Sequence, residues 1–341
     1  MKAKSLLIAA MAVFLFISTS GAVTNKSGTA AAQFLKIGVG ARAMGLGGAM
    51  VASSSDAYSL YWNPAGITKV RRPTLAGSHT QWFADIKHNF FSFVLPVNDI
   101  SAVGLQVIVL NMDDMEVTTV NEPQGTGEFF GASDIAIGAT YGLRVTNFFS
   151  LGFTGKYIQQ SIYNEKASTF ALDIGSLLDV PFYGVQLGMN FSNFGGKLQM
   201  DGRDLTREFD LNPNNTLNVG VETRLKTEPW ELPVNFRVGI SMDVLGTAEN
   251  VFNSQNSRFT LSIDGNHPTD APEYVAFGAE YAFKELLMLR GGYRLNRDVE
   301  KFFYGIGLNI PVTGATFGFD YAIASFDELD YIHIFSGSLS F

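Results

Sequence analysis

The sequence predicts an all-β protein: a 14-stranded antiparallel transmembrane β-barrel with an N-terminal plug segment. Apolar and polar residues alternate along most of the chain, and this period of two is produced by a strand and not by a helix. Only 16% of the residues are charged, whereas 13% are aromatic and 35 are glycine, so the composition carries less charge than is usual for a soluble protein. After the first residues, no apolar run is long enough for a membrane helix, so a chain that spans a membrane must do so as a closed barrel.

The composition also excludes several classes of function. The absence of cysteine excludes disulfide scaffolds, thiolate metal sites and cysteine nucleophiles. A net charge of -8 argues against binding to nucleic acid, which requires a basic surface. The serines form no GxSxG elbow, and the acidic loop residues do not have the spacing of an EF-hand. We therefore expect no catalytic residues, no cofactor, no metal site and no nucleic-acid partner.

Residues 1–22 are predicted to be a signal peptide. Lys2 and Lys4 form a basic start, an apolar stretch follows, and small residues lead to a cleavage site after Ala22. The apolar stretch is shorter than the roughly 20 residues that a membrane span needs. The protein is therefore expected to be exported.

Residues 23–72 are predicted to form the plug, or hatch, segment. They lack alternation, and their glycines fit neither GxGxxG nor a P-loop, because no GK[ST] follows. A stretch so rich in small residues can pack tightly within a narrow lumen. A short helix is expected to end before the proline, because the residue preceding a proline disfavours helix. The predicted plug turn consists of Trp62, Asn63, Pro64, Ala65 and Gly66.

Residues 73–341 are predicted to form the barrel. In the stretch 134–145, Ile135 and Ile137 lie on one face, while Asp134 and Ala136 lie on the other. Its polar face consists mainly of small residues, whereas a soluble β-sandwich would expose lysine and glutamate. Strands are expected near 73–84, 88–97, 99–111, 132–146, 148–163, 167–181, 184–194, 231–245, 256–268, 272–283, 286–295, 301–312, 314–325 and 329–341.

The connections between these strands alternate between short turns and long polar loops. Outer-membrane barrels have this asymmetry, with short periplasmic turns and longer external loops. The longest loops are 112–131 and 195–230, and an alternating piece at 214–225 fits a hairpin within the second. The stretch 246–255 is an exception, because it is long at the end where the turns should be short.

The inward faces of the predicted strands carry charges of both signs in near balance. Buried charges must be paired to be tolerated, so the balance predicts ion pairs that hold the barrel and its plug, and not an ion-selective pore. The predicted lumen charges are Asp134, Arg144, Lys156, Asp173, Arg237, Asp243, Asp264, Glu280, Arg290, Arg294 and Asp320.

The long loops carry apolar residues at their expected tips. An exposed apolar patch can hold a protein or a lipid. The predicted loop contacts are Met112, Met115, Phe129, Phe130, Leu198 and Met200.

Several motifs resemble a known family. They are FLKIGVGARAMGLGGAMVASSSDAYSLYWNPAGI at 34–67, SDIAIGATYG at 133–142, LRGGYRL at 289–295 and the ending DELDYIHIFSGSLSF. The chain resembles the FadL-like (OMPP1) outer-membrane superfamily and, within it, the PorV/PorQ family. The terminal Phe341 resembles the signal that such barrels present to their insertion machinery.

The resemblance implies a location in the outer membrane of a diderm bacterium, in contact with outer-membrane lipid. PorV-like members serve type IX secretion, so it implies the type IX translocon and secreted cargo proteins as partners, bound through the extracellular loops. More distant FadL-like members carry hydrophobic molecules inward, with the NPA turn as part of the plug. The resemblance thus leaves an alternative: a transporter with a hydrophobic small molecule, such as a fatty acid or an aromatic, in its lumen.

Overall fold

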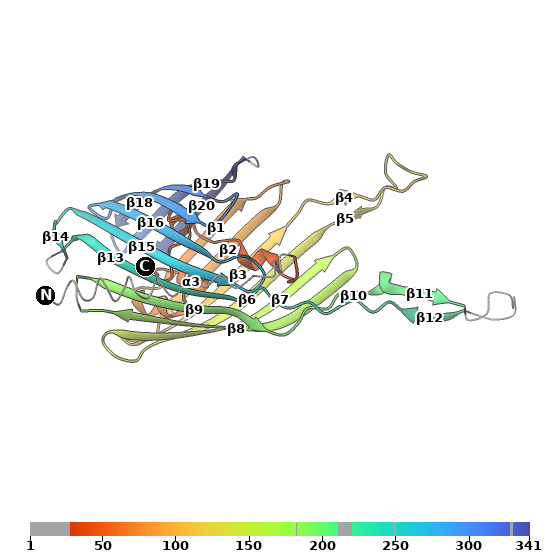
Figure 1. The fold of residues 1–341 in the computed structure, drawn as a ribbon, viewed down its shortest axis with the longest axis horizontal. Coiled ribbons are helices and arrows are strands. Elements are labelled where there is room, and N and C mark those ends of the chain that lie inside the picture. Colours follow the sequence, from red (N-terminus) through yellow and green to blue (C-terminus); the bar gives the residue numbers. More distant parts are fainter. Residues whose placement is uncertain (1–27, 182, 211–219, 248–249, 328–329) are drawn as a thin grey trace.

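The computed structural model describes residues 28–181, 183–210, 220–247, 250–327 and 330–341. The predicted signal peptide, residues 1–22, lies outside the described residues. Within the described part, no helix is both long enough and apolar enough to cross a membrane. Figure 1 shows long strands that wrap around a set of short helices from the N-terminal part of the chain.

Fourteen antiparallel strands form a closed barrel, as predicted. Each strand pairs with the next one in the sequence, and the last pairs with the first, so the barrel leaves no open sheet edge. The strands are β1 (Thr74–Gln81), β2 (Lys87–Pro96), β3 (Ser101–Asn111), β6 (Ala132–Arg144), β7 (Phe149–Ile162), β8 (Glu165–Asp179), β9 (Val185–Gly195), β13 (Asn235–Gly246), β15 (Ser257–Pro268), β16 (Tyr274–Phe283), β17 (Leu287–Leu295), β18 (Phe302–Val312), β19 (Ala315–Ser325) and β20 (Tyr331–Ser340).

The alternation in the sequence becomes the inside and the outside of the wall. In β6, Ala136 and Thr140 are buried, whereas Ile137 and Tyr141 are about half exposed. The same holds around the barrel, so the outer surface carries apolar side chains suited to lipid and the inner surface carries small and polar ones.

The two ends of the barrel differ in their connections. One end has mainly short turns, such as 97–100 and 313–314, and we call it the short-turn end. At the other, the long-loop end, two hairpins project from the barrel (Figure 1): β4 (Met115–Glu116) with β5 (Phe129–Phe130), and β11 (Thr206–Phe209) with β12 (Val221–Arg224).

The structure shows where the predicted hairpin at 214–225 and the long stretch 246–255 lie. The hairpin predicted within 214–225 includes β12, which pairs with β11, while residues 211–219 lie outside the described residues. The long stretch at the short-turn end carries β14 (Phe252–Asn253), which runs parallel to the end of β13. At the long-loop end, β10 (Asp201–Gly202) extends the sheet beside β8, and η3 (Arg203–Leu205) follows it.

The N-terminal segment, defined here as residues 28–73, lies inside the barrel and runs from one end to the other. It begins at the long-loop end, where the Ala31 amide donates to the Glu231 carbonyl at 2.9 Å. It leaves at the short-turn end, where Lys69 pairs with Asp179 at 2.7 Å and β1 begins. Its helices are η1 (Gln33–Lys36), α2 (Ala41–Gly45), α3 (Ser59–Trp62) and η2 (Pro64–Lys69).

Inward-facing glycines let the segment approach the wall closely. A Cβ on Gly188 would lie 2.4 Å from the Val51 carbonyl oxygen, and one on Gly292 would lie 2.2 Å from the Gly47 nitrogen. Side chains such as Leu60 of the segment are fully buried in the core that forms between segment and wall. The protein's own chain therefore occupies much of the described lumen.

Candidate functional site

The predicted plug turn joins the segment to the barrel wall. Asn63 ends α3 in an extended conformation, and its Oδ1 accepts the Ala65 amide at 3.2 Å, as an N-cap residue does. Its Nδ2 donates to the Val51 carbonyl at 2.9 Å within the segment and to the Ser176 carbonyl of β8 at 3.0 Å. One buried side chain thus joins two parts of the segment to a barrel strand.

Replacing Asn63 by alanine is expected to lower the free energy of unfolding by about 1–2 kcal/mol, because a cap is lost and two buried carbonyls lose a donor. Samples heated to increasing temperatures and then run on a gel would measure the change, because the folded barrel migrates faster than the unfolded chain and the temperature at which it is lost would fall. Asn98→Ala is the matched control, because Asn98 caps an exposed turn and water can replace it. Equal melting of Asn63→Ala and the wild type would contradict the assigned role.

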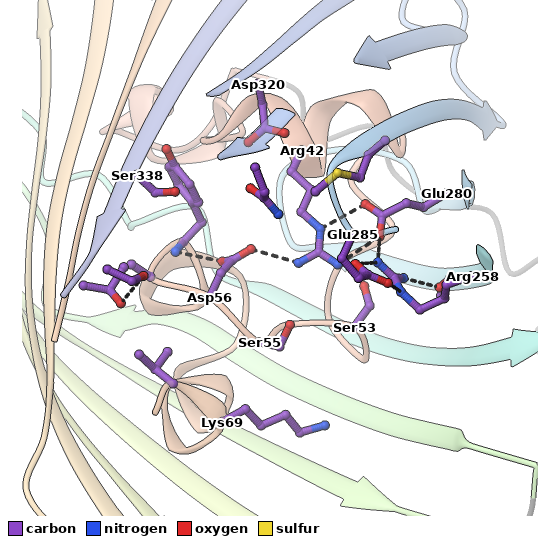
Figure 2. Close-up of a pocket in the computed structure, with 18 of the residues that line it drawn as sticks. Arg42, Ser53, Ser55, Asp56, Lys69, Arg258, Glu280, Glu285, Asp320 and Ser338 are labelled. Carbon is purple, nitrogen blue, oxygen red and sulfur yellow. Dashed lines mark hydrogen bonds and ion pairs between the residues drawn. The ribbon is translucent and has the colours of Figure 1, made fainter. Parts of the chain in front are cut away.

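A charge cluster around Glu280 of β16 holds the segment at another part of the wall (Figure 2). The Glu280 carboxylate forms ion pairs with three guanidinium groups: Arg42 of α2 at 3.1 Å, Arg258 of β15 at 2.9 Å and Arg290 of β17 at 2.7 Å. Arg42 also reaches Asp56 at 3.0 Å. Two oxygens shared among three arginines form a rigid network, because each guanidinium presents its donors in a fixed plane.

Sequence reasoning found only part of this cluster. Glu280, Arg290 and Asp320, which accepts from Arg290 at 2.5 Å, follow the strand alternation and were predicted to face the lumen. Arg42 and Asp56 lie in the segment, where no periodicity indicates which side chains face inward. Their stretch is rich in small residues and resembles the family motif at 34–67, but neither property indicates which of its side chains form ion pairs.

The other eight predicted lumen charges also lie on the inner side of the wall, and half of them contact the segment, including Arg294, which donates to the Gly47 carbonyl at 2.8 Å. Arg144 donates to the Thr68 carbonyl at 3.0 Å, and Asp264 accepts the Val51 amide at 2.8 Å. Arg237 lies over the rings of Tyr61 and Trp62, with centroid distances of 5.4 and 5.0 Å. Within the wall or its loops, the remaining pairs are Lys156 with Asp173 (2.8 Å), Asp134 with Gln160 (2.8 Å), Asp243 with Thr260 (2.5 Å) and Arg294 with Glu300.

A polar cavity of about 600 Å³ opens beside the charge cluster at the short-turn end (Figure 2). It lies between the segment and the ends of β13, β15, β17 and β19 at the short-turn end. Its lining includes the charge cluster, hydroxyl groups such as those of Ser53 and Ser338, and the basic residues Lys69, Arg71 and Arg72 where the segment leaves the barrel.

The long-loop end is closed by apolar side chains. Phe326 lies between Trp82 and Phe83, with ring centroids 5.6 and 5.1 Å apart. Phe34 and Leu35 of the segment pack in the same buried cluster. We call this group of five residues the mouth cluster.

The predicted loop contacts divide between this closed mouth and a projecting hairpin. Leu198 was expected at an exposed tip, but it is 2% exposed and packs in the core, because the loop folds back and pairs with Trp230. Met200 packs against the same core, and Met112 is half-buried. Met115 and Phe129 are exposed on the β4–β5 hairpin, where Phe130 is half-buried against Tyr163.

Comparison with solved structures finds other barrels of this shape. The Ralstonia pickettii toluene transporter TbuX superposes with a TM-score of 0.56 at 10% identity, over 89% of this chain and 97% of that one. The Pseudomonas putida toluene transporter TodX gives 0.56 at 12%, over 89% and 97%, and a Pseudomonas aeruginosa FadL homologue gives 0.51 at 13%, over 87% and 97%. At these identities the likeness shows the FadL-like fold alone. No curated protein matches the sequence.

A family model described as type IX secretion system protein PorV matches residues 20–251, more than half of the chain. The matched range covers the N-terminal segment with its plug turn and the strands from β1 to β13. The chain therefore belongs to the PorV family of outer-membrane β-barrels.

Proposed function

We propose that this protein is an accessory, or shuttle, component of type IX protein secretion that binds exported proteins through its extracellular loops. The family match is the observation that carries the proposal. The occupied lumen supports it, because a barrel whose interior is largely taken up by its own chain has its outer surface and loops left for partners. The long-loop end is then the extracellular end, and the short-turn end faces the periplasm.

The two projecting hairpins are suited to a protein partner. The β4–β5 hairpin exposes Met115 and Phe129, and the residues between its strands include Val120, which is almost fully exposed. The β11–β12 hairpin exposes Phe209 and Val221. Aromatic and methionine side chains at such positions are typical anchors of protein interfaces, because they bury a large apolar area on contact.

A second function, transport of small hydrophobic molecules, is favoured by the mouth cluster. Its aromatic rings form a buried apolar cluster at the outer end of the lumen, where a fatty acid or an aromatic molecule would have to enter. Two of the similar solved barrels are described as toluene transporters. In this alternative, the Asn63–Pro64 turn is the part of the plug that would have to move.

The double variant Met115→Ser/Phe129→Ser tests the first proposal. We expect at least a tenfold loss of exported proteins and translocon subunits that co-purify with the tagged protein from its native outer membrane. A tenfold change corresponds to about 1.4 kcal/mol. Mass spectrometry of the gently extracted protein measures these partners and bound apolar small molecules in one sample.

Val145→Ser/Phe148→Ser is the matched control, because these residues are equally exposed in a turn at the opposite end. Its partners should be unchanged. A wild-type barrel free of protein partners that carries a fatty acid or another apolar ligand would contradict the secretion proposal and support transport.

A further inference from the structure

One side of the inner wall is polar along its whole length. In the described residues of β9, β13 and β15, the inward-facing positions carry polar side chains or glycine, with Pro268 as the exception. Elsewhere the inner wall also carries buried apolar side chains, such as Ile158, Phe303 and Ile334, together with buried polar ones such as His88 and Gln106, which also have unpartnered atoms. The polar positions are Gln186, Gly188, Asn190, Ser192, Asn235, Arg237, Gly239, Ser241, Asp243, Arg258, Thr260, Ser262, Asp264 and Asn266. We call the contact between these strands and the N-terminal segment the polar seam.

Several buried atoms in the polar seam have no hydrogen-bond partner among the described residues. They are both amide atoms of Asn190, the Oδ1 atoms of Asn235 and Asp264, and the Nε of Arg237. None of these four residues is more than 6% exposed. They are neighbours, because Arg237 pairs across the ladder with Asn190 in β9, and Gly239, the next inward position, pairs with Asp264 in β15. Each unsatisfied buried group costs about 1–3 kcal/mol, so this concentration indicates a bound hydrogen-bonding ligand.

The mixture of donors and acceptors identifies the class of ligand. The Asn190 Nδ2 and the Arg237 Nε require an acceptor, whereas the Oδ1 atoms of Asn190, Asn235 and Asp264 require a donor. A simple anion would satisfy only the donors and a metal cation only the acceptors. Water does both, and a buried water typically makes about three such bonds.

The polar seam connects the two ends of the barrel. At the periplasmic end, Gln186, Ser241 and Thr260 of the same strands line the 600 Å³ cavity. At the outer end, Asp270 accepts from Lys36 at 2.9 Å and from Gln33 at 2.7 Å through one oxygen, while its other oxygen is buried without a partner. We propose that the polar seam binds water at the unpartnered atoms of Asn190, Asn235, Arg237 and Asp264, and again at Asp270 near the outer mouth.

Radiolytic labelling of the full-length protein in ¹⁸O water tests this proposal, because hydroxyl radicals formed from bound water oxidise the side chains next to it. Trp62 and Tyr61 lie under the Arg237 guanidinium and are only 2% and 8% exposed. Phe303 of β18 and Ile158 of β7 are buried on the inner face of the wall outside the seam, at 0% exposure. Dividing each labelling rate by the rate in the unfolded protein removes the intrinsic reactivity of the residue type. We expect Trp62 and Tyr61 to be at least tenfold less protected than Phe303 and Ile158.

Asn190→Leu removes both unpartnered amide atoms at similar volume and should bring the protection of Trp62 and Tyr61 toward that of Phe303. Thr154→Val is the control, because the Thr154 hydroxyl is fully buried outside the seam and is already paired with Thr140 at 2.7 Å. It should leave the labelling of Trp62 unchanged. Should wild-type Trp62 and Tyr61 be as protected as Phe303, the seam is dry and the proposal is overturned, whether or not the Asn190 variant folds.

Discussion

Replacing Glu280 by glutamine is expected to lower the free energy of unfolding by about 3–5 kcal/mol, the range seen when one partner of a buried ion pair is removed. The Glu280 side chain is 3% exposed and forms ion pairs with three arginines, of which Arg290 is 1% exposed. Glutamine keeps the shape of the side chain but removes the negative charge and one acceptor. Three guanidinium groups would then face one another with insufficient compensation.

Denaturant unfolding of the purified barrel, followed by tryptophan fluorescence or by gel mobility, measures this loss. Glu285→Gln is a sharp control, because Glu285 pairs with Arg258 in the same network but is 59% exposed. An exposed pair contributes about 1 kcal/mol or less. If the two variants unfold at the same denaturant concentration, the cluster around Glu280 does not hold the segment in the barrel.

Replacing Gly292 by alanine should displace the N-terminal segment. A Cβ at this position would lie 2.2 Å from the backbone nitrogen of Gly47, and a backbone atom cannot rotate away as a flexible side chain can. Overpacking of this kind costs about 1–3 kcal/mol or more. Because the clash falls between segment and wall, the segment should separate while the strand pairing remains.

Its neighbour provides the control. A Cβ on Gly291, which faces outward, meets nothing within 4 Å, so Gly291→Ala carries the same change in backbone freedom without the clash. Limited proteolysis of barrels in detergent distinguishes the two, with cleavage between residues 33 and 70 expected only for Gly292→Ala. Equal resistance of both variants would show that the segment tolerates a shift from β17.

The strands were predictable because one face of the barrel wall contacts lipid and the other faces the lumen. Apolar and polar residues must therefore alternate along each strand. The beginning of β13 was placed too early, at 231, because the sequence does not show that Trp230 first pairs with Leu198 across the mouth. The same fold-back explains Leu198, which was expected to be exposed. An apolar residue in a polar loop has the same local pattern whether it covers the core or points to a partner.

The same alternation predicted which charged residues face the lumen, but it did not predict which residues they contact. Glu280 and Arg290 could be placed on the lumen side, since each occupies an inward position of its strand. Arg42 could not, because α2 is one short helix without a repeating apolar face. Which oxygen of Glu280 meets which arginine depends on how the segment lies in the lumen, and this is a property of the tertiary structure.

The path of the N-terminal segment constrains how the molecule can be assembled. The chain passes lengthwise through a closed ring of strands and continues directly into β1, whose pairing with β20 completes the ring. Once these strands have joined, the segment could enter only by sliding past glycines that leave no space and past the arginines on Glu280. We therefore expect the segment to bind to the open sheet first and the strands to close around it. The segment then acts as a template on which the barrel closes. A variant that weakens its binding to the strands should lower the rate of barrel closure more than the stability of the folded protein.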